Sequence, residues 1–133
     1  MSDRGSIAVL LLGIIGLLVV LGLMLGAAGQ YLAVRSRLQA AADAAALAAA
    51  PVTFRPFGSA GDPTAEAARF AQANGGRLIR CHCPIDPSWE ARIVEVEVGE
   101  EINLIGLGRR EIRTKAAAEF VPVELLPVET SDG

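Results

Sequence analysis

One short run in the 133-residue sequence, Cys81-His82-Cys83, holds residue types that bind metals or exchange electrons. A C-x-C pair on a strand points both thiols to one face and the histidine to the other, whereas structural zinc sites take four ligands from two elements. Metal binding is therefore disfavoured, and buried, unreacted thiols are the favoured interpretation. A disulfide between the two cysteines is the alternative outside the cytosol, although the ring that it closes is tight.

The other residues with chemical potential lack the context that catalysis needs. Glu95 and Glu97 alternate along an amphipathic strand, where glutamates normally form the solvated face. Gly106-Leu107-Gly108 is followed by Arg109-Arg110, without the helix and further glycine of a phosphate-binding loop. With one histidine and no metal-ligand spacing, the chain offers no set of acid, base and nucleophile. We expect no catalytic residues, no metal and no cofactor.

Charge and hydropathy favour a membrane and disfavour nucleic acid as the partner. The 12 lysines and arginines are outnumbered by 15 acidic residues and form no basic cluster that could follow a phosphate backbone. The 23 residues from Ile7 to Gly29 contain no charged side chain. As a helix they would be about 35 Å long, enough to cross a hydrocarbon core of about 30 Å. We therefore predict one transmembrane helix over 7–29, in contact with membrane lipid.

A cleavable secretory signal is the main alternative to this membrane helix. Arg4 supplies a positive start, and Gly26-Ala27-Ala28-Gly29 offers small residues for a peptidase. Signal cores are about 7 to 15 residues long, however, and this apolar run continues directly into a helix-forming segment. Cleavage after Gly29 would instead give a secreted protein.

The helix is expected to continue beyond the lipid. From Tyr31 to Ala50 the sequence has no glycine or proline and is rich in residues of high helix propensity. Pro51 is expected to end the helix, which would then run from about Ser6, half in lipid and half in water. Gln30 and Tyr31 fall where interfacial residues usually lie.

Small residues recur along this helix at alternating spacings of four and three, the a/d spacing of a coiled coil. The helix-packing seam consists of Gly22, Gly26, Gly29, Ala33, Ser36, Ala40, Asp43, Leu47 and Ala50. Gly22 and Gly26 form a G-x-x-x-G pair that permits close approach of another helix in lipid, which predicts a homo- or hetero-oligomer. The alternative is that glycine and alanine are simply common here. For Asp43, a solvated face is favoured over a register position that meets a donor on a neighbouring helix.

The remaining sequence predicts a small α+β domain. Segment 51–63 is expected to be a loop anchored by Phe54 and Phe57, and Asp62 is expected to cap a helix from Pro63 to Ala73. Strands are predicted at Leu78–Cys83, Arg92–Val98 and Arg109–Val121, followed by an extended edge from Pro122 and a frayed acidic tail. The predicted class is a membrane-anchored α+β protein with a long N-terminal helix, a short second helix and an antiparallel sheet of about three strands. The expected division is a cytoplasmic N-terminus 1–6, transmembrane helix 7–29, soluble helix extension 30–50, α+β domain 51–122 and flexible tail 123–133.

The sequence resembles the TadE/TadG-like pilus-assembly proteins, especially a small actinobacterial TadE-like group. The likeness rests on Asp3-Arg4-Gly5-Ser6-Ile7-Ala8-Val9 at the start of the membrane helix and on the alanine-rich run from Arg35 to Ala50. It extends loosely through Asn74-Gly75-Gly76-Arg77-Leu78 and Gly106-Leu107-Gly108-Arg109-Arg110. The resemblance implies a pilin-like fold and a structural role as a minor pilin or pseudopilin of a tight-adherence (Flp) pilus or related secretion apparatus. Its partners would be other Tad/Flp assembly proteins or pilins, bound through the N-terminal helix.

Two positions depart from the family pattern. Gly5 and Ser6 form a candidate prepilin processing site, but Leu10 stands where processed members carry glutamate, so we expect the mature protein to keep Met1 or Ser2. Thr64 stands about where TadE-like members often carry a partner cysteine, so the disulfide that the family pattern would form with Cys81 is not expected.

Orientation follows from two indications that disagree. Arg35 and Arg37 outnumber Arg4 at the helix ends, so the positive-inside rule slightly favours a cytoplasmic domain. The resemblance implies a single-pass protein of the inner (plasma) membrane with residues 31–133 outside the cytoplasm, and we follow it. The alternative function is a single-pass membrane-anchored binding or accessory protein of another envelope system.

Overall fold

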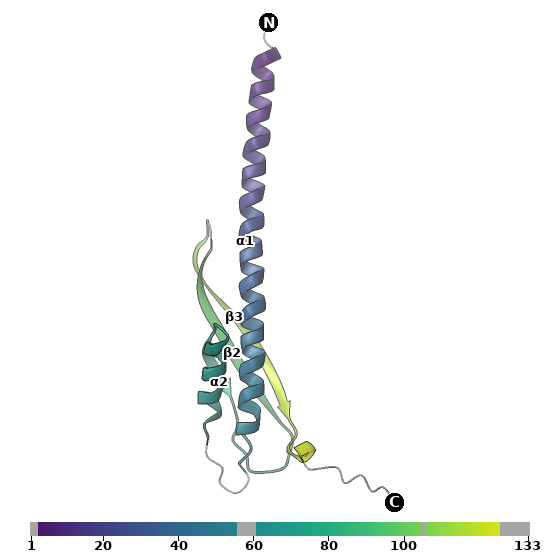
Figure 1. Ribbon diagram of the computed structural model, residues 1–133, viewed down its shortest axis with the longest axis vertical. Helices are drawn as coiled ribbons and strands as arrows, with labels where there is room; N and C mark the ends of the chain where they lie inside the picture. The colour runs from purple at the N-terminus through teal and green to yellow at the C-terminus, as the bar shows by residue number, and fades with distance from the viewer. Residues whose placement is uncertain (1–2, 56–60, 105, 126–133) are drawn as a thin grey trace, which may run out of the picture.

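The computed structural model describes residues 3–55, 61–104 and 106–125. Its elements are α1 (Asp3–Val52), α2 (Pro63–Ala73), β1 (Arg77–His82), β2 (Arg92–Leu104), β3 (Gly108–Phe120) and a 3-10 helix (Pro122–Leu125). The strands form one antiparallel sheet in the order β1-β2-β3. The N-terminal half of α1 projects alone, while the other elements gather around its C-terminal half (Figure 1). This arrangement confirms the predicted α+β class with one long helix, one short helix and three strands.

Helix α1 is continuous over 50 residues and passes without a break from the apolar run into the alanine-rich segment. The predicted last residue, Ala50, was two residues early, because Pro51 lies within the last turn and the helix ends at Val52. The chain leaves the helix through tighter bonds, in which the N–H groups of Thr53 and Phe54 donate to carbonyls three residues back, each at 3.2 Å. The helix therefore ends one residue after the proline.

Helix α2 has the predicted bounds and the predicted caps. The Asp62 carboxylate accepts a hydrogen bond of 3.0 Å from the N–H of Thr64, and Pro63 occupies the first helical position. At the other end Gly75 has a φ of +79°, and the Gly76 N–H donates to the Ala71 carbonyl at 2.9 Å. The left-handed glycine turns the chain back toward the sheet.

Strands β2 and β3 form a long hairpin whose register runs from Arg92 opposite Phe120 to Leu104 opposite Gly108. The prediction that β2 ends at Val98 was wrong, because Ile102 and Leu104 keep the same inward parity and are buried. The predicted first strand and the predicted third strand each lie one residue C-terminal to β1 and β3.

The extended edge expected from Pro122 was also wrong. Residues 122–125 form a 3-10 helix, because β2 begins at Arg92, opposite Phe120, and offers no further partner. The flexible tail was predicted over 123–133: residues 123–125 belong to this 3-10 helix, and residues 126–133 lie outside the described part of the chain.

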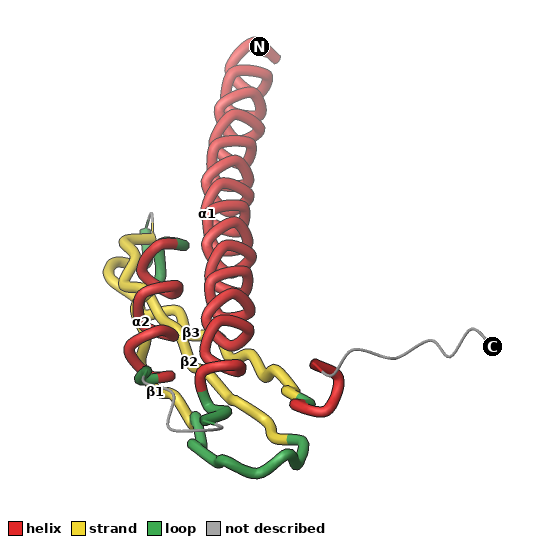
Figure 2. Tube along the Cα trace, turned by 60° about the horizontal axis from the view of Figure 1, so that its bottom comes forward, coloured by secondary structure: helices red, strands yellow, loops and turns green. Residues whose placement is uncertain are grey.

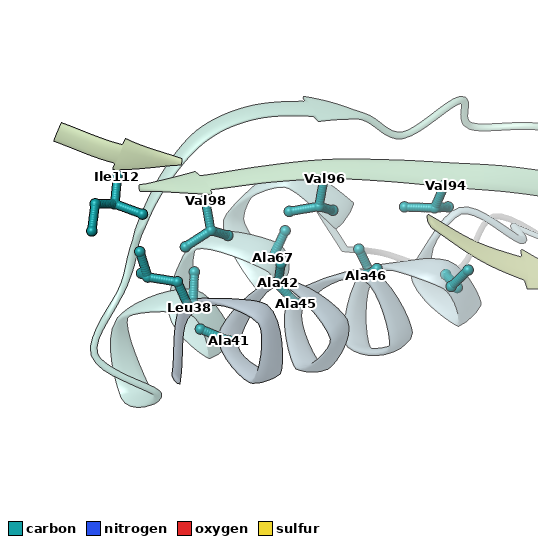
Figure 3. Close-up of a cluster of buried hydrophobic side chains, with 14 of the residues drawn as sticks. Leu38, Ala41, Ala42, Ala45, Ala46, Ala67, Val94, Val96, Val98 and Ile112 are labelled. Carbon is teal, nitrogen blue, oxygen red and sulfur yellow. The ribbon is translucent and has the colours of Figure 1, made fainter. Parts of the chain in front are cut away.

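Both helices cover one face of the sheet and lie side by side upon it (Figure 2). Val94, Val96 and Val98 are buried and point from β2 toward small residues of α1 (Figure 3). The residues of α1 that are buried in this core are Leu38, Ala41, Ala42, Ala45, Ala46, Ala49 and Ala50. Because alanine side chains are short, the helix backbone can approach the sheet closely, and the bulk is supplied by the valines.

The end of the domain opposite the N-terminus of α1 is closed by aromatic residues. Phe54 is 9% exposed, and its ring centre lies 4.9 Å from that of Trp89 and 6.1 Å from that of Phe120. This confirms Phe54 as a buried anchor of the loop, whereas Phe57 lies outside the described part of the chain.

Candidate helix-packing surface

Helix α1 has two opposite faces. Its inward face, which includes Val34, Leu38, Ala41 and Ala45, packs against the domain. At 3.6 residues per turn, the predicted seam is centred about 160° around the helix from this face. All seven seam positions from Gly22 to Asp43 are exposed: Gly22, Gly26, Gly29, Ala33, Ser36, Ala40 and Asp43. The chain therefore packs its own domain on one face of α1 and leaves the small-residue face open.

The C-terminal end of the seam differs from the prediction. Leu47 is 67% exposed and continues the open face, but Ala50 is only 3% exposed and belongs to the core of the domain. Ala50 was therefore wrongly included. Ala50 lies in the core cluster together with Ala46 and Ala49 of the preceding turn.

The glycines of the seam are not required by packing within the chain. A Cβ built at Gly22, Gly26 or Gly29 meets no atom within 4 Å, and the same holds for Gly13 and Gly16. Gly13 and Gly16 lie on a different side of the helix, more than about 90° from the seam centre. Of these five glycines, only Gly22, Gly26 and Gly29 belong to the seam, so Gly13 and Gly16 serve as a comparison set.

Beyond the apolar span, the open face forms a shallow groove. It is lined by Leu32, Arg35, Ser36, Gln39, Ala40 and Asp43. The Gln39 side-chain amide donates to an Asp43 carboxylate oxygen at 3.1 Å and to the Lys115 carbonyl at 3.3 Å. Asp43 is thus an exposed charge with a partner one turn earlier on its own helix, as the favoured interpretation of a solvated face expects.

The outer face of the sheet carries charges in cross-strand pairs. Arg80 lies 3.1 Å and Arg113 4.0 Å from the Glu97 carboxylate, and Arg77 lies 3.2 Å from that of Glu111. Glu95 and Glu97 lie on this outer face, as predicted, beside a depression that also contains His82. The Glu97 carboxylate is engaged by two arginines, an arrangement that fits surface pairing of strands more closely than acid–base chemistry.

Cys81 and Cys83 form a disulfide. The favoured interpretation of two unreacted thiols was therefore wrong. Strand β1 ends at His82, so Cys83 leaves the regular strand geometry, and its Cα lies 5.5 Å from that of Cys81, within the usual range for a disulfide. Because Cys83 is the partner of Cys81, no cysteine is required at position 64, where this chain has threonine.

Arg92 is a structural residue that the sequence reasoning missed. It is 7% exposed, and its guanidinium donates to the carbonyls of Thr53 at 3.3 Å and Glu90 at 3.1 Å, and also to those of Asp86 and Ser88. The signal was its parity, since Arg92 precedes three valines of the inward face by steps of two. An inward-facing arginine at the start of a strand indicates a buried guanidinium that donates hydrogen bonds to main-chain carbonyls of the neighbouring loops.

Fold and surface together define a class: an α+β protein carried on one long helix, with a membrane-capable apolar half and an open packing face. The apolar window has a mean hydropathy of 3.1, and none of it is buried within the chain. Its exposure distinguishes it from the core helix of a soluble protein.

Residues 5–52 match the family described as "Putative Flp pilus-assembly TadE/G-like". The matched segment is almost all of α1, which carries both the apolar span and the open face. The match shows a likeness to Flp pilus-assembly proteins over this helix, which is less than half of the chain. No curated protein and no solved structure matches the chain significantly.

Proposed function

We propose that this chain is a minor pilin or pseudopilin, a non-enzymatic structural component of a Flp/Tad-type pilus or related secretion apparatus. It is anchored in the inner membrane by residues 7–29. Its small α+β domain lies outside the cytoplasm, and the open face of α1 packs against the N-terminal helix of another assembly protein or pilin. The family match over residues 5–52 and the apolar span support the assignment.

The observation that carries the proposal is the division of α1 into opposite faces. A helix that served only to anchor the domain would need no particular face in lipid or beyond it. Here the inward face is occupied by the domain of the same chain, while a stripe of small residues stays exposed from Gly22 to Asp43. In lipid, close contact between small residues is a principal source of helix association, because no hydrophobic effect operates there. The open face is therefore available to a second helix along both halves of α1.

The disulfide supports the proposed orientation. Disulfides persist in oxidising compartments and are rare in a reducing cytosol. The Cys81–Cys83 bond therefore favours an extracytoplasmic domain, in agreement with the resemblance. The positive-inside rule opposes this by the small excess of Arg35 and Arg37 over Arg4, which is a weak bias.

Substitution of seam glycines tests the packing role. The full-length chain, tagged at its C-terminus, is isolated in mild detergent from cells that express the Flp/Tad proteins. Gly22→Ile and Gly26→Ile should abolish its co-purification with Tad assembly proteins or pilins, because the larger side chain keeps a second helix away from α1. Gly13→Ile and Gly16→Ile are the matched controls, since they add the same side chain to open glycines away from the seam. Complexes unchanged in all four variants would refute the packing role.

Thiol labelling tests the orientation. Cys81 and Cys83 are bonded to each other, so Glu119→Cys, at an exposed position of β3, supplies the reactive thiol. An impermeant maleimide should label this variant in cells whose inner membrane is intact, after the outer barrier is opened. Labelling that requires lysis of the inner membrane would place the domain in the cytoplasm and would overturn the pilin assignment.

A further inference from the structure

The turn of the β2–β3 hairpin lies at the level where the apolar span of α1 ends. The hairpin rises beside α1 toward its N-terminus (Figure 1). The Gln30 side-chain amide donates a hydrogen bond of 3.2 Å to the carbonyl of Asn103, next to the last residue of β2. Because Gly29 is the last residue of the apolar span, this bond places Asn103 at the boundary between lipid and water. Beyond Asn103, β2 continues for one residue, Leu104, which is about 3 Å of strand before the turn.

The residues of the hairpin change in character with distance from the turn. Leu104 is buried against the core, whereas Leu107 on the other side of the turn is 61% exposed. Next come Arg109 and Arg110, both exposed and, among the residues that the structure describes, without an ion pair.

Acidic residues begin further from the turn. Glu111 is paired with Arg77 and Arg113, and Glu100 with Arg37 of α1. Glu101 lies opposite Glu111 and is exposed. The order from the turn downward is thus apolar, basic, then acidic.

We propose that this hairpin tip, defined by Leu107, Arg109 and Arg110, is a second membrane-contacting site that binds anionic phospholipid beside α1. Leu107 enters the boundary between headgroups and acyl chains, and Arg109 and Arg110 bind lipid phosphates. The inference rests on the membrane anchoring in the proposed function.

The order of residue types along the tip matches the layers of a bilayer. An exposed apolar side chain is stabilised at the acyl boundary, cations are stabilised at the phosphates, and carboxylates stay in water. Arginine is suited to phosphate because its planar guanidinium forms paired hydrogen bonds. Free phosphate would use the arginines but would leave Leu107 in water, so a lipid headgroup is the source that fits both features. A tip held at the membrane also fixes the rotation of the domain about α1, which determines where the open face points.

Tryptophan fluorescence of the full chain in vesicles tests the proposal. Trp89 is the only tryptophan and lies in the aromatic cluster at the far end of the domain. Leu107→Trp in a Trp89→Phe background places the reporter at the tip, and Leu18→Trp in the same background reports insertion of α1. The probe is phosphatidylcholine with brominated acyl chains, with and without phosphatidylglycerol. The tip tryptophan should be quenched and blue-shifted in vesicles that contain phosphatidylglycerol, whereas Trp89 of the wild type should not.

The three reporters separate failure of this inference from failure of the anchor. Quenching at residue 18 without quenching at residue 107 would overturn the lipid contact and leave the anchor intact. In that case a protein, and not lipid, would be the expected contact of the exposed Leu107. Absence of quenching at both positions would overturn the anchor itself.

Charge removal tests the role of the arginines. In the tip-tryptophan chain, Arg109→Gln with Arg110→Gln should reduce tip quenching in anionic vesicles. Each arginine near an anionic surface contributes about five-fold to the equilibrium between docked and free tip. Arg69→Gln with Arg80→Gln removes the same charge from two exposed arginines elsewhere in the domain and should leave the quenching unchanged. An equal effect of both double variants would show that only the overall charge matters and would overturn the assignment to Arg109 and Arg110.

Discussion

The side-chain amide of Gln30 donates a hydrogen bond to the main-chain carbonyl of Asn103, across a sequence separation of 73 residues. The bond joins the point where the helix leaves its apolar run to the upper end of the hairpin. About two helical turns after Gln30, the Arg37–Glu100 ion pair links α1 and β2 a second time. The hairpin is therefore held along α1, and the domain is carried close to the boundary of the proposed membrane.

Replacement of Gly76 by alanine should destabilise the domain. A Cβ at this position overlaps Val98 Cγ1 and lies 3.2 Å from Leu38 Cδ2, in the contact between α1 and β2. We expect Gly76→Ala to lower the free energy of unfolding by about 1–3 kcal/mol, the usual cost of overpacking a core. Denaturant unfolding in detergent measures the change. Gly16→Ala is the control, since its Cβ meets nothing within 4 Å and it lies away from the seam, and equal stability of the two variants would contradict the prediction.

Arg92 should be required for closure of the distal end of the domain. Its guanidinium donates to four main-chain carbonyls, those of Thr53, Asp86, Ser88 and Glu90. Arg92→Met removes these donors and should cost about 3 kcal/mol or more, because buried carbonyls lose their partners. Arg92→Lys should recover only part of the loss, because an ammonium group cannot span the same set of acceptors.

The matched control for Arg92 is Arg69→Met. Arg69 is an exposed arginine whose partner Glu66 lies on the same helix. Its replacement should leave the unfolding midpoint almost unchanged, because exposed ion pairs contribute little. A midpoint shift as large as that of Arg92→Met would show that burial of Arg92 is not what matters.

Acid should destabilise the domain through Asp86. The backbone N–H of Ser88 donates to its carboxylate at 2.8 Å, and with the Ser88 side chain and the charge of Arg92 it lowers the pKa of Asp86 below its usual range. The folded chain therefore binds this proton less readily than the unfolded chain does. The stabilisation is complete above the unfolded pKa and is lost as the pH falls below about 4, through the lower folded pKa.

The pKa of Glu66 is lowered in the same sense, first by its hydrogen bond from Arg69. Unfolding midpoints measured from neutral pH downward should therefore fall in acid, and Asp86→Asn should fall less steeply over this window. A midpoint that rises as the pH falls would contradict the assignment.

Loss of the disulfide should be tolerated. The ring between Cys81 and Cys83 encloses a single residue, so it restricts the unfolded chain little, by about 1.5 kcal/mol in the chain-entropy description. Cys81→Ser with Cys83→Ser should still fold, as should the wild type in reductant. Intact mass establishes oxidation through the loss of two hydrogens, and circular dichroism follows the fold. Unfolding on reduction would show that the bond is structurally essential.

The N-terminus is expected to remain unprocessed. Gly5 and Ser6 lie in the first turns of α1, and Leu10 stands five residues into the segment that would follow cleavage. Intact-mass measurement of protein from the native membrane should find most of it beginning at Met1 or Ser2. A species that begins at Ser6 would show that Leu10 is tolerated and would strengthen the pilin proposal. One that begins at Gln30 would instead indicate a secreted protein.

The sequence by itself determined the elements whose signals are local. The apolar run and the alanine-rich segment predicted α1 because length and propensity act within one helix. Asp62, Pro63 and the glycines after Ala73 predicted both ends of α2, because caps depend on adjacent residues. Val94, Val96 and Val98 identified the inward face of β2 through their alternation.

Tertiary structure decided the features that depend on residues far apart in the chain. The extension of β2 from Gly99 to Leu104 depends on its pairing with β3 and its packing on α1. The local hydropathy near Gly99 and Glu100 did not indicate this extension. Sequence spacing could list the seam, but only the position of the sheet decided that Ala50 is buried and that the rest of the seam faces away from the core. The levels of Gln30 and Asn103 coincide because the hairpin folds back along the helix, a relationship that no local pattern encodes.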